Sequence, residues 1–196
     1  TKKKLLIPSK MQFVTEMSYT FIAKMINDTA GSNAKPFFPF IFTLFMFVLF
    51  CNMIGMLPYS FTVTSHIIVT FMLAITVFIG VTIIGFVKHR IKYLELFVPK
   101  GVPIALLPLI IIIEIISYLA RPVSLSVRLF ANMMAGHTML KVFGGFVISL
   151  GLLGGWLPLS FAVALTGLEI LIAFLQAYVF AILTCIYLND ALNLHH

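Results

Sequence analysis

Six polar or charged residues recur at helical spacing within a long apolar stretch of the sequence. Three or four positions separate each from the next: Glu114, Ser117, Arg121, Ser124, Arg128 and Asn132. This spacing predicts that all six lie on one face of an α-helix. A charged side chain inside a bilayer costs about 3 kcal/mol or more, and such residues normally mark a path for ions. The stripe therefore indicates ion movement across a membrane.

A second polar stripe lies in the last apolar stretch and repeats the same spacing: Thr166, Glu169, Ala173 and Gln176. We consider an antiparallel hairpin around the glycine-rich turn at 151–155. The residue numbers of two positions that face each other across such a hairpin add up to a nearly constant value. This register predicts three pairs: His137 with Glu169, Arg128 with Gln176, and Glu114 with Asp190. A histidine beside a carboxylate can relay protons near neutral pH.

The two arginines of the first stripe differ in how easily a structural role explains them. Arg121 precedes Pro122, which removes a helical hydrogen bond, so its guanidinium could satisfy the freed carbonyls or lipid headgroups. An ion pair between Arg128 and Glu114 is disfavoured, because fourteen residues span about 21 Å of helix.

Other polar residues also have structural explanations. His137 and Glu169 could form an inert buried pair. Lys141 is best explained by its long side chain reaching the membrane interface. His66 also fits an interfacial position, and Asn52 fits a hydrogen bond between helices.

The histidines and cysteines do not form a metal-binding pattern. The terminal His195-His196 pair has no third ligand, and neither Cys51 nor Cys185 belongs to a CxxC motif. We therefore expect no metal site, no disulfide and no cofactor. Both cysteines are predicted to be small buried apolar residues.

The composition sets the environment of the whole chain. Of its 196 residues, 61% are hydrophobic and only 10% are charged, and the mean hydropathy is +1.12. A soluble domain needs roughly a quarter of its residues charged to cover its surface. The predicted fold class is therefore an all-α membrane protein.

Ten of the 13 basic residues fall in two short segments: Lys2, Lys3, Lys4, Lys10, Lys24, Lys35, Lys88, Arg90, Lys92 and Lys100. Basic segments beside apolar spans are typical of the side retained inside during membrane insertion. The net charge of +7 therefore reflects membrane orientation and predicts no nucleic-acid partner.

The elements that position the stripes follow from the apolar runs. A capping-box pattern at Ser9 and Gln12 opens an amphipathic surface helix that ends near 27–31. Residues 37–57 and 61–87 are each long enough to span a bilayer. Segments 102–150 and 157–188 would be about 70 and 48 Å long, against a hydrocarbon core of ~30 Å. They are therefore either steeply tilted, or the first breaks at Arg121-Pro122.

These elements divide the chain into four parts. The surface helix and its basic segment occupy 1–36, and a transmembrane hairpin occupies 37–87. A basic inside loop covers 88–101, and an ion-translocating hairpin of two long helices covers 102–196.

The string from Arg121 to His137, RPVSLSVRLFANMMAGH, closely resembles the signature of subunit a of F-type ATP synthases. LTGLE at 165–169, LQAYVF at 175–180 and YLNDA at 187–191 resemble the same family. The match covers the whole chain and is closest to mitochondrial and alphaproteobacterial members. The family usually has one more membrane helix ahead of the surface helix. None precedes it in this sequence, which begins at Thr1, and a removed upstream segment is one explanation.

The resemblance implies a stator subunit that moves protons, with two long, steeply tilted helices beside a ring of c subunits. Arg128 matches the essential arginine, and Glu114 matches a residue of the inner half-channel. His137 and Glu169 match the pair of the opposite half-channel, with Gln176 and Asn132 near the arginine. Secondary candidates for proton translocation are Arg121, Asp190 and Ser124. The chain has no phosphate loop, so ATP chemistry is expected elsewhere.

The implied partners are the c-ring, the peripheral stalk and other membrane-sector subunits, lipids and protons. The implied location is the mitochondrial inner membrane or, alternatively, the alphaproteobacterial plasma membrane. A secondary cation transporter is the main competing hypothesis, although such folds usually contain internal repeats, which are not evident here. A purely structural membrane anchor would leave the polar stripe unexplained.

Overall fold

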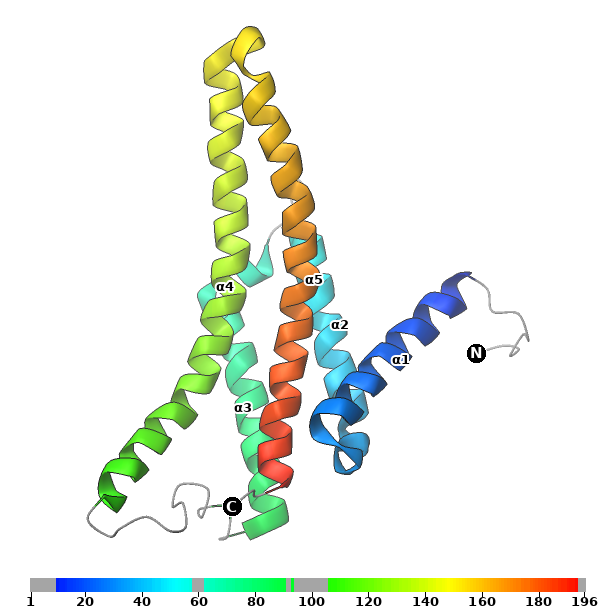
Figure 1. The fold of residues 1–196 in the computed structure, drawn as a ribbon, viewed down its shortest axis with the longest axis vertical. Coiled ribbons are helices and arrows are strands. Elements are labelled where there is room, and N and C mark those ends of the chain that lie inside the picture. Colours follow the sequence, from blue (N-terminus) through cyan, green and yellow to red (C-terminus); the bar gives the residue numbers. More distant parts are fainter. Residues whose placement is uncertain (1–9, 58–61, 91–92, 94–105, 194–196) are drawn as a thin grey trace.

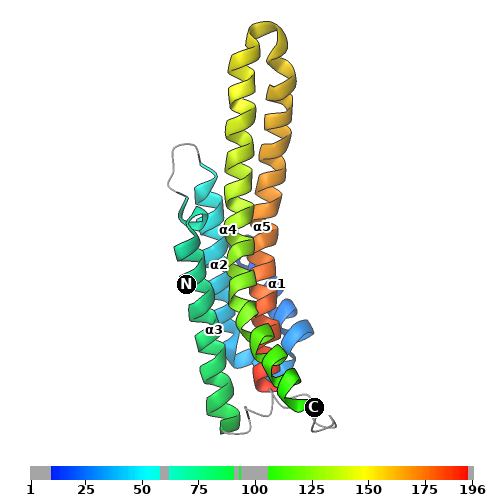
Figure 2. The same cartoon turned by 90° about the vertical axis from the view of Figure 1, so that its left-hand side faces the viewer.

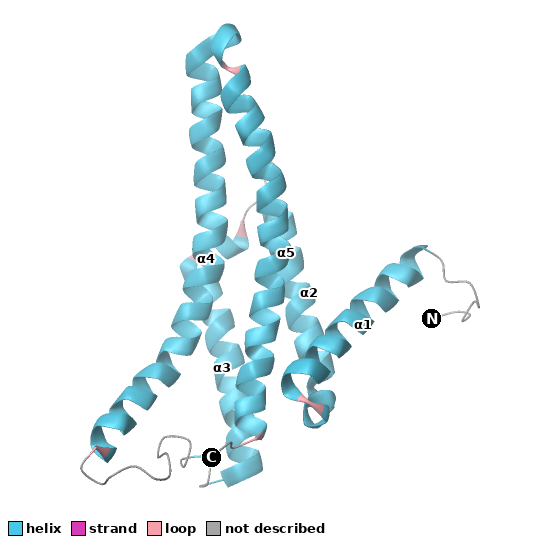
Figure 3. Ribbon diagram, in the orientation of Figure 1, coloured by secondary structure: helices cyan, strands magenta, loops and turns pink. Residues whose placement is uncertain are grey.

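The structure is a computed structural model that describes residues 10–57, 62–90, 93 and 106–193. Within these residues all regular secondary structure is helical, which confirms the predicted all-α class (Figure 3). The elements are α1 Lys10–Ala30, η1 Ser32–Phe37, α2 Phe38–Gly55, η2 Val63–Ser65, α3 Ile67–His89, α4 Leu107–Gly154 and α5 Trp156–Leu192.

Four helical segments are long and apolar enough to cross a membrane, judged by length and composition: Ala34–Gly55, Ile67–His89, Leu107–Gly151 and Trp156–Leu192. They form two antiparallel hairpins, α2–α3 and α4–α5, as the sequence predicted. The α4–α5 hairpin extends well beyond the end of the α2–α3 hairpin (Figures 1 and 2).

Helix α3 begins later than the predicted span. The predicted start, residue 61, lies outside the described residues, and the chain first forms the short η2 turn. His66 then precedes the helix in an extended conformation. Its carbonyl accepts the backbone N–H groups of Val69 and Thr70, at 3.1 and 3.2 Å. Polar residues before an apolar run thus delay the start of this helix.

Helix α1 is amphipathic over only part of its length. Its end at Ala30, before the positive φ of 69° at Gly31, confirms the predicted end. Ile22, Met25 and Ile26 are buried, as expected for an apolar stripe. The other predicted members are exposed: Val14, Met17 and Phe21. Val14 and Met17 are exposed because the first part of α1 projects away from the bundle (Figure 1). Phe21 is partly exposed but still contacts the rings of Phe45, Phe174 and Tyr178. Ser9, the predicted cap, lies outside the described residues.

Helix α4 resolves the question left open at Arg121-Pro122. The helix continues through Pro122, and its one non-helical backbone conformation lies at Gly151, with φ 61° and ψ −160°. The hairpin turn therefore falls at the glycine-rich segment. Below the middle of its length, α4 diverges from α5 (Figure 1). Because a proline removes one helical hydrogen bond, Pro122 accounts for a bend rather than a break.

Helix α5 carries most of the packed core between the helices. Its buried face alternates small and large residues: Ala173, Ala177, Phe180, Ala181, Cys185 and Leu188. Small side chains allow helices within a membrane to approach closely. Asn52 of α2 uses this proximity, since its buried amide donates to the carbonyl of Ala173 at 3.3 Å. The predicted interhelical role of Asn52 is therefore confirmed.

Candidate functional site

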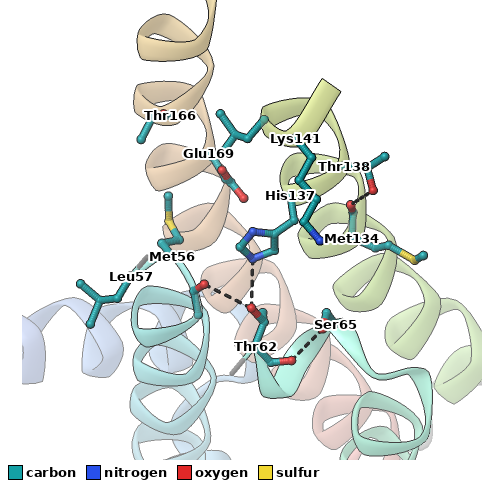
Figure 4. A pocket seen from close by; sticks show the side chains of 12 residues that line it. Met56, Leu57, Thr62, Ser65, Met134, His137, Thr138, Lys141, Thr166 and Glu169 are labelled. Atoms are coloured by element: carbon teal, nitrogen blue, oxygen red, sulfur yellow. Dashed lines mark hydrogen bonds between the residues drawn. The ribbon is translucent and has the colours of Figure 1, made fainter. Parts of the chain in front are cut away.

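A cavity of about 680 Å³ lies where the end of α2, the η2 turn, α4 and α5 meet (Figure 4). Its lining combines apolar and polar side chains: Gly55, Met56, Leu57, Thr62, Ser65, Met134, His137, Thr138, Leu140, Lys141, Thr166 and Glu169. The titratable groups in this lining are His137, Lys141 and Glu169. The cavity therefore contains the His137–Glu169 pair predicted from the hairpin register.

Glu169 reaches this cavity from α5 and is almost entirely enclosed. The residue is 6% exposed, and its Oε1 atom has no hydrogen-bond partner among the described residues. Its carboxylate and the His137 ring point toward one another (Figure 4). A buried carboxylate oxygen without a protein partner is costly unless a proton, a water or a charged donor reaches it. The arrangement suits a group that exchanges protons.

Gly136 leaves room for the side chain of Glu169. A Cβ atom at this position would lie 2.5 Å from Glu169 Oε1 and 2.7 Å from its Cδ. No side chain larger than hydrogen fits here without displacing the carboxylate. This role of Gly136 could not be predicted from the sequence, because a single glycine within a helix shows no periodic signal of its own.

His137 is also in contact with the connection between α2 and α3. Its Nε2 atom lies 3.1 Å from the hydroxyl of Thr62, and that hydroxyl donates to the carbonyl of Gly55 at 3.2 Å. Sequence reasoning did not single out Thr62, which lies in a short turn without a repeating pattern.

Further along the hairpin, α4 and α5 are joined by an amide pair. Asn132 Nδ2 donates to Gln176 Oε1 at 2.7 Å. The predicted pairing of Gln176 with Arg128 is therefore wrong by one helical turn. Gln176 is buried, whereas Arg128 is exposed. The two helices do not keep the constant register that a flat hairpin would have.

Arg128 has no carboxylate partner within the part of the chain that the structure describes. The buried face of α4 is formed instead by its apolar neighbours Leu125, Leu129 and Met133. The guanidinium therefore faces outward from the four-helix arrangement. Ser117 and Ser124, two other members of the predicted stripe, are exposed as well.

At the opposite end of the bundle, Arg121 forms an ion pair with Asp190. The Nη1–Oδ2 distance is 3.1 Å, and the two side chains are 23% and 37% exposed. The predicted pairing of Asp190 with Glu114 is therefore wrong by two helical turns. The cause is the divergence of α4 from α5, which carries Glu114 away. Arg121 accordingly binds a carboxylate, rather than the freed carbonyls or lipid headgroups considered above.

Aromatic side chains surround this ion pair. The Arg121 guanidinium lies 5.4 Å from the ring centre of Tyr118 and 5.2 Å from that of Tyr187. The Tyr118 hydroxyl is 2.7 Å from Thr82 Oγ1 and 3.0 Å from the Tyr93 hydroxyl. Burial, followed by the hydrogen bond with Tyr118, raises the pKa of Tyr93 well above its usual range. One polar cluster thus connects α3, the following loop, α4 and α5.

The remaining candidates have simpler surroundings. Lys141 is exposed at the rim of the cavity. Neither cysteine forms a disulfide; Cys185 is buried as predicted, whereas Cys51 is only partly buried. Among the described residues, no group of three or more His, Cys, Asp or Glu side chains could hold a metal ion. The terminal histidine pair lies outside the described residues.

Comparison with known proteins identifies the family. The model of the family described as ATP synthase A chain matches residues 1–189. The chain is 80% identical to ATP synthase subunit a of Pelagibacter ubique (strain HTCC1062), over 100% of this chain and 80% of that protein. It is 62% identical to ATP synthase subunit a of Chelativorans sp. (strain BNC1), over 100% of this chain and 81% of that protein.

The chain belongs to the ATP synthase subunit a family. This confirms the resemblance carried by the string from Arg121 to His137. The relatives named above are alphaproteobacterial, and together with the four long apolar helices they support a multi-pass membrane protein. Of the two locations that the sequence left open, the bacterial plasma membrane fits these relatives.

Proposed function

We propose that this chain is the proton-translocating stator subunit of a rotary ATP synthase. In this proposal two aqueous half-channels lead protons to and from a ring of c subunits, and Arg128 separates them. Proton flow then drives rotation of the ring, and ATP is made by other subunits. The peripheral stalk, other membrane-sector subunits and lipids complete the surroundings of the chain.

The cavity at His137 and Glu169 supports one half-channel. It is polar in part and large enough for many water molecules, and it lies at the end of the α2–α3 hairpin remote from Lys88 and Arg90. Water needs a roomy site with polar partners, and the cavity offers both. Protons can pass between bulk water, the imidazole and the carboxylate in short steps.

Glu114 and the Arg121–Asp190 cluster support the other half-channel. They lie toward the end where α3 finishes, at Lys88 and Arg90, and α4 begins (Figure 1). Glu114 is half-buried on the part of α4 that diverges from α5. Asp190 is more than a third exposed, so its carboxylate is accessible to water despite its ion pair.

Arg128 carries the proposal, because it is an exposed charge on an apolar helix without an acidic partner among the described residues. It lies nine residues, or about 13 Å along α4, from His137, and about 21 Å from Glu114. A guanidinium stays protonated at any relevant pH. Such a charge attracts an ionised ring carboxylate and repels a proton that would cross directly between the half-channels. Asn132 and Gln176, held together one turn away, are positioned to assist it.

The experiment measures ATP synthesis and passive proton flux in membrane vesicles that contain the whole ATP synthase with Arg128→Ala or Arg128→Lys. Both variants should assemble and lose proton-driven synthesis by at least about a hundredfold, since the alanine variant loses the charge and the lysine variant the planar fork. Arg128→Ala should also leak protons. Arg90→Ala, which removes an exposed arginine outside the long helices, is the control and should behave as wild type.

Near-normal synthesis by Arg128→Ala would remove this residue from the mechanism. It would then favour the competing hypothesis of a secondary transporter. That hypothesis makes a separate prediction, because a transporter reconstituted alone should move solute, whereas a stator subunit should not.

A further inference from the structure

The hydroxyl of Thr62 is the one polar group from the α2–α3 connection that contacts the His137 ring in the described residues. We propose that Thr62 is a positioning residue for proton transfer at His137, and that its hydroxyl selects which ring nitrogen exchanges protons. The inference rests on the proposed function, because it concerns how the imidazole acts within the cavity.

The hydrogen-bond directions follow from the number of protons available. A threonine hydroxyl has a single proton, and a backbone carbonyl has none. The Thr62 hydroxyl donates that proton to the carbonyl of Gly55. We infer that this proton stays in the hydrogen bond to the Gly55 carbonyl, so that His137 Nε2, 3.1 Å from the Thr62 hydroxyl, is the donor in their contact. Neutral His137 is thus held as the Nε2–H tautomer, and Nδ1 is left to accept a proton.

Thr62 is itself held in place. Ser65 Oγ donates to the carbonyl of Thr62 at 2.7 Å, which fixes the backbone of the turn. On the other side, the Thr62 methyl group packs against Gly55, since it lies 2.7 Å from where a Cβ of that glycine would be. The hydroxyl therefore has one well-defined position, between α2 and the imidazole (Figure 4).

A fixed tautomer assigns both proton transfers to one ring nitrogen, Nδ1. A proton from the cavity adds to Nδ1 of neutral His137 and forms an imidazolium, while Nε2–H stays bonded to Thr62. The same Nδ1 proton then passes to the Glu169 carboxylate, and the neutral tautomer is restored. Glu169 then releases this proton to the next acceptor of the proposed path, a ring carboxylate, and returns to the carboxylate form, so that protons and charge balance over each cycle. The titratable groups around the ring are Glu169 from α5 and Lys141 from α4 itself.

The test compares three variants of Thr62 with wild type in vesicles that contain the whole ATP synthase, with rates expressed per assembled complex. Thr62→Val keeps the shape and loses the hydroxyl, and we expect proton-driven synthesis to fall on the order of tenfold. Thr62→Ser keeps the hydroxyl and should stay within about twofold of wild type. If the valine variant does not assemble, Thr62→Ala replaces it. Thr76→Val is the control, because the Thr76 hydroxyl donates to the carbonyl of Met72 at an exposed position of α3.

A second readout separates positioning from packing. Imidazolium makes a stronger hydrogen bond than neutral imidazole, so loss of the Thr62 hydroxyl costs the protonated ring more. The pH profile of synthesis should therefore move to lower pH in Thr62→Val and stay in place in Thr62→Ser and Thr76→Val. Equal losses in the valine and serine variants, or an unmoved profile, would overturn the inference.

His137→Ala distinguishes failure of this inference from failure of the proposed function. If His137→Ala abolishes synthesis and Thr62→Val is normal, only the role of Thr62 is refuted. If His137→Ala itself supports normal synthesis, the proposed half-channel is refuted, and the role of Thr62 is refuted with it.

Discussion

Glu169 depends on the absence of a side chain at Gly136. The carboxylate occupies the volume that a Cβ atom would fill, and its Oε1 atom is buried without a partner in the described residues. If Glu169 exchanges protons as proposed, the space at Gly136 and proton exchange are linked at this point. Gly136 does not titrate, but in our proposal it affects proton transfer because it leaves room for the Glu169 carboxylate.

Gly136→Ala tests this link. A methyl group 2.5 Å from Oε1 forces the carboxylate to move, and overpacking of this kind costs about 1–3 kcal/mol. We expect proton-driven synthesis to fall about tenfold, because a displacement of about 1 Å is enough to impair a positioned reacting group. The measurement is ATP synthesis in vesicles that contain the assembled complex.

Gly144→Ala is the matched control, because a Cβ atom there would meet nothing within 4 Å and the residue lies on the same helix. It should be active. If both alanine variants are equally active, the enclosure of Glu169 at Gly136 has no functional consequence.

At the scale of elements, the α4–α5 hairpin is joined at three levels by different chemistry. His137 and Glu169 meet at the cavity, Asn132 bonds to Gln176, and Arg121 bonds to Asp190. The last level is reinforced by the rings of Tyr118 and Tyr187 around the guanidinium. The Arg121–Asp190 contact lies where α4 diverges from α5 and where Pro122 removes a helical hydrogen bond. We therefore expect this contact to matter most for holding the two helices in register.

We therefore predict that Arg121 and Asp190 stabilise the hairpin as a coupled pair. Arg121→Gln, Asp190→Asn and the double variant should show a coupling of about 1–2 kcal/mol in a double-mutant cycle, since the pair is charge-assisted but partly exposed. The measurement is thermal unfolding of the purified complex. The exposed Gln12–Glu16 pair of α1, changed to Ala in the same scheme, should show much weaker coupling. Additive effects at Arg121 and Asp190 would show that the pair does not fix the register.

The accuracy of the predicted register falls with distance from the hairpin turn. The His137–Glu169 pair was predicted correctly. The partner of Gln176 was wrong by one helical turn, and that of Asp190 by two. Constant register requires straight helices lying side by side, and sequence periodicity reports the face of a single helix only. Pro122 permits a bend in α4, but how far α4 then diverges from α5 depends on tertiary packing, which the periodicity does not contain.

Other features also divide into those that a local sequence pattern predicts and those that arise only when the chain is folded. Long apolar runs predicted the four long helices, and the polar stretch at 27–31 predicted the end of α1. Residues outside any repeat were missed, although Thr62 and Tyr118 each make hydrogen bonds to other parts of the fold. They come from turns and helix faces with no periodic polar pattern, so only the packed structure reveals them.

At the scale of the whole molecule, the two hairpins differ in length. Helices α2 and α3 have 18 and 23 residues, close to the length that crosses a bilayer. Helices α4 and α5 have 48 and 37 residues, or about 72 and 55 Å. They exceed the ~30 Å hydrocarbon core, so we expect them to be inclined within the membrane.

Membrane orientation gives the last prediction. The basic segments predict that the end of α3 lies on the cytoplasmic side of the membrane. Because α4 and α5 each cross the membrane once, the end of α5 returns to that same side. Single cysteines are introduced at Arg90 and Asn193 near that side, and at Leu57 and Ser149 near the other, with Cys51 and Cys185 changed to alanine. An impermeant maleimide should label the first two in inside-out vesicles and the second two in right-side-out vesicles. Solubilised protein, in which all four react, is the control for accessibility. Labelling of Leu57→Cys or Ser149→Cys from the same side as Arg90→Cys would contradict this orientation, and it would place the His137–Glu169 cavity on the wrong side for the proposed path.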